Sequence, residues 1–341
     1  MKSRHIVIPI FVPHKGCPFE CIYCNQRTIS GQISEMTVAE MKRIIEDNLT
    51  TVSNPDYVEI GFFGGSFTGI DRKQQIEFLE TANRYIEEGA VRELRLSTRP
   101  DYINEEILDY LKKYNVKTIE LGVQSLDEDV LRKSCRGHSV EDVIRSSSLI
   151  KKYGIRLGLQ TMIGLPGDNA QKDMETAEKV ISLKPDLVRI YPTLVIKGTY
   201  LEKMYREGTY SPLSMEEAVA ICSHLLDVYE SNGIKVIRVG LQPTESINSF
   251  RDVVAGPFHP AFRQLVESRR MLNRIEREIN EKNLGNNKEL VIYAHKKRIS
   301  DIVGQKRANI NYITRTYNIR KVTVRERDSD EVDKIDIFVN S

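Results

Sequence analysis

The chain has 341 residues, of which 40% are hydrophobic and 29% charged, and this length suits one large domain followed by a small one. No apolar run reaches the roughly 18 residues that a membrane span needs, and five cysteines, an odd number, do not fit a disulfide framework, so we expect a protein of the reducing cytoplasm. The net charge of +2 hides a basic tail, because residues 251–341 hold 19 Lys and Arg against 13 Asp and Glu, a balance typical of a nucleic-acid surface or of a solvated charged helix.

Strand-like and helix-like stretches alternate over the first 240 residues. Strands are predicted at 6–11, 57–63, 93–98, 118–123, 156–163 and 187–193. Amphipathic helices are predicted at 37–49, 72–89, 139–154 and 214–233. Repeated strand–helix units imply parallel strands joined by right-handed crossovers. We therefore predict an α/β fold, a partial (β/α)6-type parallel barrel.

The rest of the chain predicts a connector and a second domain. A charged helix is predicted at 263–283, and "LGNN" then breaks the pattern. Strand, helix, turn, helix, strand and strand follow, which is the pattern of a small α+β domain. We expect a barrel at 1–250, a helical connector at 251–284 and the small domain at 285–341.

A cluster of cysteines follows the first predicted strand. The stretch "GCPFECIYC" (16–24) contains Cys17, Cys21 and Cys24. Three thiolates on one tight loop can each ligate one iron of a four-iron cluster and leave the fourth iron open. A zinc site usually needs a second pair of ligands, which this chain lacks. The alternative is three unrelated thiols.

The second predicted strand ends in "GFFGGSF", where Gly64 and Gly65 allow the backbone to approach a ligand. With this pair and the cysteine loop, the sequence resembles the radical S-adenosylmethionine (SAM) superfamily. The resemblance implies a [4Fe-4S] cluster on the three cysteines and SAM bound to its open iron through the methionine part. It also implies that the glycine pair meets the methionine amino group, and that an electron donor such as flavodoxin or ferredoxin serves the cluster.

Further motifs indicate one branch of this superfamily. The blocks, in order, are "STRPDYI" (97–103), "ELGVQSLDEDVL" (120–131), "RGH" (136–138), "GLPG" (164–167) and "YPTLVIKGTYL" (191–201). Over about residues 5 to 245 they resemble the radical domain of the elongator catalytic subunit. The resemblance implies that Gln124 and Arg136 contact the methionine carboxylate or the ribose of SAM, and that Gln160 meets the ribose hydroxyls.

The sequence also departs from that branch. Ser97 stands where the family has an acidic residue, so this contact with SAM is expected to differ. The acetyltransferase domain that follows in the family is replaced here by about 90 residues of other sequence, too few for that fold. The resemblance therefore does not imply acetyl-CoA chemistry.

No catalytic residue beyond the cluster is identified, and two weak candidates remain. Cys135, next to Arg136, is either a thiol that reacts with a radical or, as free cysteines more commonly are, a small buried residue. Lys197 in "VIKGT" is either a cation at the mouth of the pocket or a solvated loop lysine.

The tail contains a second recognisable motif. "ISDIVGQKRANINYI" (299–313) resembles the centre of a KH module, in which a Gly-x-x-Gly loop between two helices clamps single-stranded nucleic acid. The corresponding loop is Gly304, Gln305, Lys306 and Arg307, and its last glycine is absent. Loop amides at a helix N-terminus beside two cations suit an RNA phosphate. The alternative is a small domain that binds nothing.

Three functions are compatible with these observations. The first is a radical SAM enzyme that modifies tRNA or rRNA. The second is a small-molecule radical enzyme resembling coproporphyrinogen oxidase, with a structural tail. The third is a non-catalytic RNA-binding or assembly protein, against which the intact cysteine loop argues. The basic tail favours the first over the second.

Overall fold

The computed structural model describes residues 4–12, 21–25, 36–52, 57–241, 252–328 and 331–340. By their internal contacts they form two compact units. The first consists of residues up to 214 together with 229–258, and the second of 215–228 together with 259–341. None of the helices in the described part of the chain is long and apolar enough to cross a membrane.

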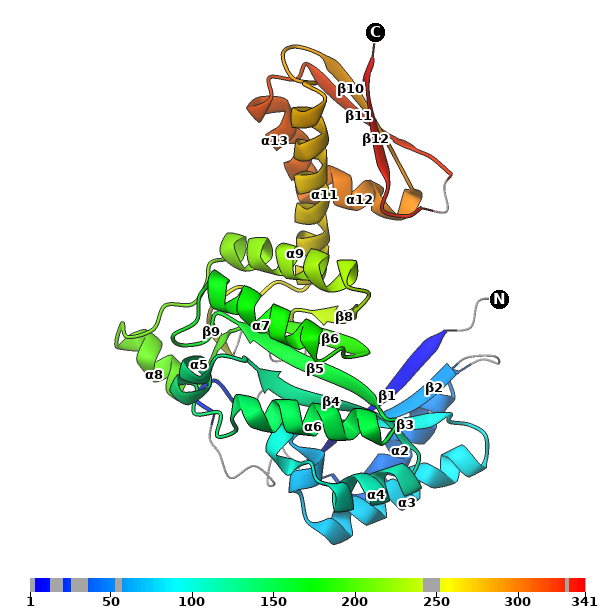
Figure 1. Ribbon diagram of the computed structural model, residues 1–341. Helices are drawn as coiled ribbons and strands as arrows, with labels where there is room; N and C mark the ends of the chain where they lie inside the picture. The colour runs from blue at the N-terminus through cyan, green and yellow to red at the C-terminus, as the bar shows by residue number, and fades with distance from the viewer. Residues whose placement is uncertain are drawn as a thin grey trace. The chain divides into compact units, whose positions relative to one another are not determined.

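The first unit is built on a parallel sheet of seven strands in the order β1-β2-β3-β4-β5-β6-β8 (Figure 1). The strands are β1 (His5–Val12), β2 (Tyr57–Gly64), β3 (Glu93–Thr98), β4 (Val116–Gln124), β5 (Arg156–Ile163), β6 (Leu187–Pro192) and β8 (Lys235–Val239). This order confirms the predicted partial barrel, and β8 adds a seventh strand to the six that were predicted. All neighbours run parallel, so their carboxyl ends share one edge.

Helices join these strands and cover the sheet. They are α2 (Val38–Leu49), α3 (Arg72–Glu87), α4 (Glu105–Lys113), α5 (Glu128–Lys133), α6 (Val140–Lys152), α7 (Ala170–Ser182) and α8 (Tyr200–Arg206). Local sequence sets their starts: Ser139 and Asp142, for example, form the capping box of α6. Two short strands, β7 (Val195–Ile196) and β9 (Val253–Ala255), pair antiparallel outside the main sheet.

The second unit contains two long helices, two short helices and a sheet. They are α9 (Met215–Ser231, of which residues 215–228 belong here), α11 (Phe262–Glu281), α12 (Ile299–Val303), α13 (Ala308–Thr316), β10 (Glu289–Ala294), β11 (Lys321–Glu326) and β12 (Ile335–Asn340). The strand order is β11-β10-β12, with β11 parallel and β12 antiparallel to β10. Apolar side chains of α11, α12 and α13 pack against one face of this sheet to form its core, including Ile275, Ile302 and Ile313.

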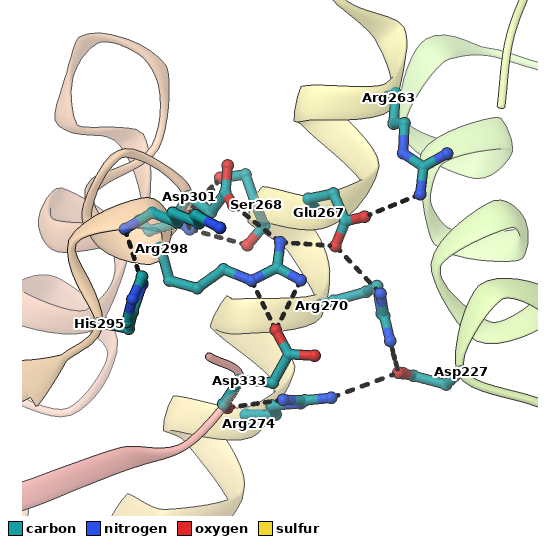
Figure 2. Close-up of polar contacts among 12 residues, drawn as sticks. Asp227, Arg263, Glu267, Ser268, Arg270, Arg274, His295, Arg298, Asp301 and Asp333 are labelled. Atoms are coloured by element: carbon teal, nitrogen blue, oxygen red, sulfur yellow. Dashed lines mark hydrogen bonds and ion pairs between the residues drawn. The ribbon is translucent and has the colours of Figure 1, made fainter. Parts of the chain in front are cut away.

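A network of ion pairs ties the elements of the second unit together (Figure 2). The carboxylate of Glu267 on α11 accepts from Arg270 at 3.0 Å and from Arg298 at 3.1 Å. Arg298 also pairs with Asp333 before β12, and Arg270 pairs with Asp227 on α9 at 2.8 Å. Because Arg270 is only 2% exposed, these carboxylates balance a charge that is otherwise costly to bury.

Candidate functional site

The predicted site residues of the first unit gather at the carboxyl edge of the sheet. Gly64 and Gln124 are the last residues of β2 and β4. Ser97 and Gln160 lie within β3 and β5, one and three residues before the strands end. Barrel enzymes place their chemistry at this edge, because side chains from several strands converge there. These residues come from segments that are up to about a hundred residues apart in the chain.

The described part of the cysteine loop, residues 21–25, is anchored to two other loops. Cys21 and Cys24 lie on one tight turn, closed by a hydrogen bond from the Cys24 amide to the Cys21 carbonyl at 2.9 Å. The amide of Ile22 donates to Ser134 after α5, and its carbonyl accepts from Leu201 at the start of α8. The loop thus depends on the chain after β4 and β6. Cys17 lies outside the described residues.

Arg136 connects this loop to the sheet. Its guanidinium donates to the sulfur of Cys21 at 3.4 Å and to the carbonyl of Gly122 in β4 at 2.6 Å. A Cβ atom at Gly122 would lie 2.7 Å from the same guanidinium, so a larger residue there would displace the Arg136 side chain. Arg136 is 8% exposed, so its positive charge is buried beside the sulfur of Cys21.

Gln124 offers an acceptor without a partner. The β4–β5 register shifts next to it, and its backbone has a left-handed φ of 69°, which is unusual for glutamine. Its side-chain oxygen is buried and accepts no hydrogen bond from the residues that the structure describes. A buried acceptor of this kind is costly, so it indicates a place where a ligand donates.

The glycine pair forms a turn against the end of β1. Gly64 has φ of +93°, and a Cβ atom there would lie 3.1 Å from the carbonyl oxygen of Val12. The amide of Gly65 donates to the same carbonyl at 3.2 Å. The turn therefore holds β2 close to the last residue of β1, which directly precedes the cysteine segment in the chain.

Gln160 is held by a polar network inside the sheet. Its amide donates to the Ser97 hydroxyl at 3.1 Å and to the Glu120 carboxylate at 3.3 Å. Glu120 is fully buried and pairs with Arg95 and Arg189. Ser97 and Glu120 are register partners on β3 and β4, so a neighbouring strand places a carboxylate beside Ser97.

Sequence reasoning missed the charged part of this network. Glu59, Arg95, Glu120 and Arg189 lie on the same face as Gln160, while the alternate residues of these strands are apolar and buried. Burial raises the pKa of Glu59 despite the nearby arginines. Burial alone would lower the pKa of Arg189, but the Glu120 carboxylate raises it. The available signal was a charged, polar or glycine residue at alternate positions of otherwise apolar strands.

His138 is a neutral part of the same region. Burial, followed by the charges of Arg136 and Arg99, lowers its pKa to about 3. A ring nitrogen lies 3.2 Å from the carbonyl of Val123 near the end of β4. His138 therefore supports the loop around Arg136 without adding charge at neutral pH.

The two weak catalytic candidates are both exposed. The expectation that Cys135 is a small buried residue is wrong: it has a left-handed φ of 51° in the turn after α5, and this turn directs it to solvent. Lys197 is exposed, and its backbone carbonyl accepts from the side chain of Asn25 at 2.9 Å. Lys197 is thus next to the cysteine loop through its backbone.

A pair of carboxyls lies behind the loop that follows β5. The Asp168 carboxylate accepts from the amides of Gly164 and Asn169, and it shares a hydrogen bond with Asp173 on α7. Burial raises the pKa of Asp173 to about 9, and the negative charge of Asp168 adds to this effect. The pair therefore shares a proton at neutral pH.

This proton makes stability depend on pH. Folded protein keeps it up to about pH 9, whereas the unfolded chain releases it near the ordinary value of 3.8, so stability falls by about 1.4 kcal/mol per pH unit between these values. Asp173→Asn cannot lose a proton, and we expect its gain in melting temperature over wild type to be larger at pH 8 than at pH 5. Thermal unfolding at both pH values, with Glu178→Gln as an exposed control on the same helix, measures this. An equal gain at both would contradict it.

In the second unit, the Gly304–Arg307 loop joins α12 to α13 through a 3-10 turn. Gly304 has φ of +73°, and Lys306 and Arg307 also adopt positive φ values of 50° and 62°. Arg307 therefore takes a left-handed conformation, which glycine would adopt at less cost. Both basic side chains are exposed, while Asn309 behind them is buried and donates to Ser268 and Asp301. The loop is rigidly supported and presents two cations.

The donor set at the sheet edge fits the cluster and cofactor that the resemblance implies. Cys21 and Cys24 are close in the chain, and Arg136 offsets the negative charge of bound thiolates. Gln124 provides an acceptor for a cofactor amine or hydroxyl, and Gly64 allows the backbone to come near. Among the described residues no set of three or more metal-ligating side chains occurs. Cys17, the third cysteine of the loop, lies outside those residues.

Comparison with protein families agrees with this geometry. The model of the Radical SAM superfamily matches residues 11–180, and that of the Radical SAM C-terminal domain matches residues 185–274. The tRNA uridine(34) acetyltransferase of Methanocaldococcus infernus is 32% identical over 258 residues, which cover 64% of this chain and 48% of that protein. An uncharacterized protein of Methanocaldococcus jannaschii is 31% identical over 238 residues, covering 66% and 72%.

Other relatives match only part of this chain. Elongator complex protein 3 of Saccharomyces cerevisiae is 29% identical over 191 residues, or 50% of this chain and 34% of that one. The chain spans about half or less of the length of the tRNA-modifying relatives it matches. A solved structure of Methanocaldococcus infernus Elp3 aligns with a TM-score of 0.63 at 23% identity, over 85% of this chain and 66% of that one, and so shares its fold.

Proposed function

Because the chain belongs to the radical SAM superfamily, we propose that it uses a [4Fe-4S] cluster to cleave SAM and modifies a base of tRNA or rRNA. Cys17, Cys21 and Cys24 would ligate the cluster, which supplies the electron for cleavage when it is bound. The observation that carries the proposal is the contact of Arg136 with both the Cys21 sulfur and the Gly122 carbonyl. It places a thiol of the cysteine loop at the carboxyl edge of the sheet, where the other predicted cofactor residues lie.

The described residues have separate tasks in this proposal. Arg136 holds Cys21 at the sheet edge and would offset the negative charge of cluster-bound thiolates, and Gly64 with Gly65 leaves room for the methionine part of SAM. Gln124 accepts a hydrogen bond from the bound cofactor. Gln160 orients the ribose, and the ion pairs of Glu120 keep the Gln160 amide from rotating.

RNA is the proposed substrate for two reasons. Three of the relatives are named tRNA uridine(34) acetyltransferase, and they match between 52% and 64% of this chain. In addition, the Gly304–Arg307 loop presents two exposed cations at the start of α13, as a phosphate site requires. We propose RNA binding for this KH-like tail, an electron donor such as flavodoxin or ferredoxin, and a cytoplasmic location. The proposal does not include acetyl transfer.

A comparison of modified nucleosides tests the whole proposal. Total tRNA and rRNA from a deletion strain and its parent are digested and analysed by mass spectrometry. We expect one modified nucleoside to disappear in the deletion strain and to return when the gene is restored. Identical profiles in both RNA pools would contradict an RNA substrate.

Cofactor affinity tests the placement of SAM. Gln160→Ala and Arg136→Ala each remove polar contacts worth about 1 to 3 kcal/mol, so we expect roughly 5- to 150-fold weaker SAM binding. Isothermal titration of the anaerobically reconstituted protein measures affinity, and iron content shows that the cluster is retained. Gln171→Ala, an exposed glutamine on α7, is the control. Unchanged affinity in both variants would mean that SAM binds elsewhere.

A further inference from the structure

The sheet of the second unit has one covered and one open face. Alternate residues such as Leu290, Ile292 and Ile337 point into the core with α11, α12 and α13. The residues between them form the other face, and strand register aligns them in rows. One row joins Thr323, Val291 and Phe338 across the three strands, and the next joins Arg325, Tyr293 and Asp336.

Two aromatic rings occupy the centre of this open face. Phe338 is 57% exposed, although the outward positions of such a strand are usually polar. The Tyr293 ring meets it edge to face, with centroids 5.9 Å apart and planes at 76°. Val291 lies in the same row as Phe338 but is only 7% exposed, so the two rings supply most of the exposed apolar surface of this face. Rings fixed in this way offer a flat apolar surface that is ordered before a ligand arrives.

The charges around the rings are mainly positive. Glu289 is paired with Arg320 and Asn340, and Asp336 is paired with Arg327, so both acidic groups of the face are compensated. Lys321 and Arg325 on β11 add two exposed cations to the face: Lys321 lies opposite Glu289, which is already paired with Arg320, and Arg325 lies 3.5 Å from the Tyr293 hydroxyl. A cationic rim beside aromatic rings is complementary to a chain that carries both phosphates and flat bases.

We propose that this open face, defined by Val291, Tyr293, Phe338, Lys321 and Arg325, binds single-stranded RNA. Bases stack on the two rings, and the cations contact the phosphates. The inference rests on the proposed function for its choice of RNA. It assigns a second contact, separate from the Gly304–Arg307 loop, because the helices that flank that loop pack against the opposite face of the sheet.

Affinity and its salt dependence distinguish base stacking on the aromatic rings from ionic contacts with the phosphates. The probe is a labelled oligouridylate of about eight nucleotides, followed by fluorescence anisotropy with the full chain at several salt concentrations. Phe338→Ala should weaken binding roughly 5- to 150-fold without changing the salt slope, because it removes stacking and no charge. Lys321→Glu with Arg325→Glu should also reduce the slope. Phe338→Tyr and Tyr205→Ala, the latter an exposed aromatic on α8, should bind like wild type.

A fluorescence measurement reports stacking directly. The chain has no tryptophan, so Phe338→Trp introduces a single tryptophan into the open face, which can be excited selectively over the tyrosines. We expect the oligonucleotide to quench the tryptophan fluorescence, with a midpoint that agrees with the anisotropy.

The outcomes separate the two proposals. If wild type binds RNA, Phe338→Ala binds with the same affinity and the tryptophan is not quenched, the stacking face is wrong but the proposed RNA function still stands. If wild type binds neither this probe nor tRNA, the proposed function fails as well. A dimer that Phe338→Ala converts to monomer in sedimentation would make the face a self-association surface instead.

Discussion

Replacing Cys21 or Cys24 with alanine is expected to abolish cleavage of SAM to 5′-deoxyadenosine. A cluster that loses one of three thiolate ligands is no longer held in its site, and no other described thiol lies in this loop. Iron and sulfide content, the visible absorption of the reconstituted protein and chromatographic detection of 5′-deoxyadenosine measure the effect. Cys17→Ala should behave in the same way, although Cys17 lies outside the described residues.

Cys222→Ala is the matched control. It also removes one thiol, but this one is fully buried in α9, in the second unit. We expect a modest loss of stability, of about 1 kcal/mol, with full iron content and cleavage. If SAM cleavage persists when all three loop cysteines are replaced, the proposed radical SAM activity is contradicted, whatever the result of the control.

Reversing the charges of the tail loop is expected to weaken RNA binding by more than about tenfold. Lys306→Glu with Arg307→Glu places two negative charges at the start of α13, where we expect a phosphate. Both side chains are exposed and lie away from the buried Asn309 contacts, so the fold should tolerate the change. Filter binding to tRNA and rRNA at several salt concentrations measures affinity. SAM cleavage without RNA should stay at the wild-type level, because the cysteines lie in the other unit.

Lys112→Glu with Lys113→Glu applies the same charge change to exposed residues of α4 in the first unit. If the Gly304–Arg307 loop contacts RNA specifically, this control variant should reduce RNA affinity much less than the tail-loop variant does. If only the net charge of the protein matters, the two variants should reduce affinity equally. Tail-loop variants that bind RNA as well as wild type would show that this loop is not the contact.

Most of the architecture followed from periodicity, because buried parallel strands and amphipathic helices leave clear apolar patterns. The positions of Gln124 at the end of β4 and of Gln160 inside β5 were also predictable, since they need only the order of the elements. The ion pairs of Glu120 with Arg95 and Arg189 were not, because they depend on the register of four strands, β3 to β6, including a shift between β3 and β4. Register is set by side-chain packing across the sheet, which a single sequence does not display.

Local backbone conformation was the other feature that could not be predicted from the sequence. Cys135 is exposed because the turn after α5 takes a left-handed conformation there, and a free cysteine gives no sign of this in sequence. Arg307 likewise occupies the last position of a loop that would favour glycine, and adopts a positive φ itself. In both cases tertiary contacts decide a conformation that the residue type alone disfavours.

The second unit is built from two separate stretches of the chain, and this limits how the chain can be divided into fragments. Residues 215–228 and 259–341 belong to it, while the intervening 229–258 belong to the first unit. A fragment starting at residue 285 would lack α11, whose Met271 and Ile275 are part of its core, and one starting at 259 would deprive Arg270 of Asp227. No single proteolytic cut releases an intact tail. Exchange of this tail between relatives therefore requires two separate stretches of sequence to move together.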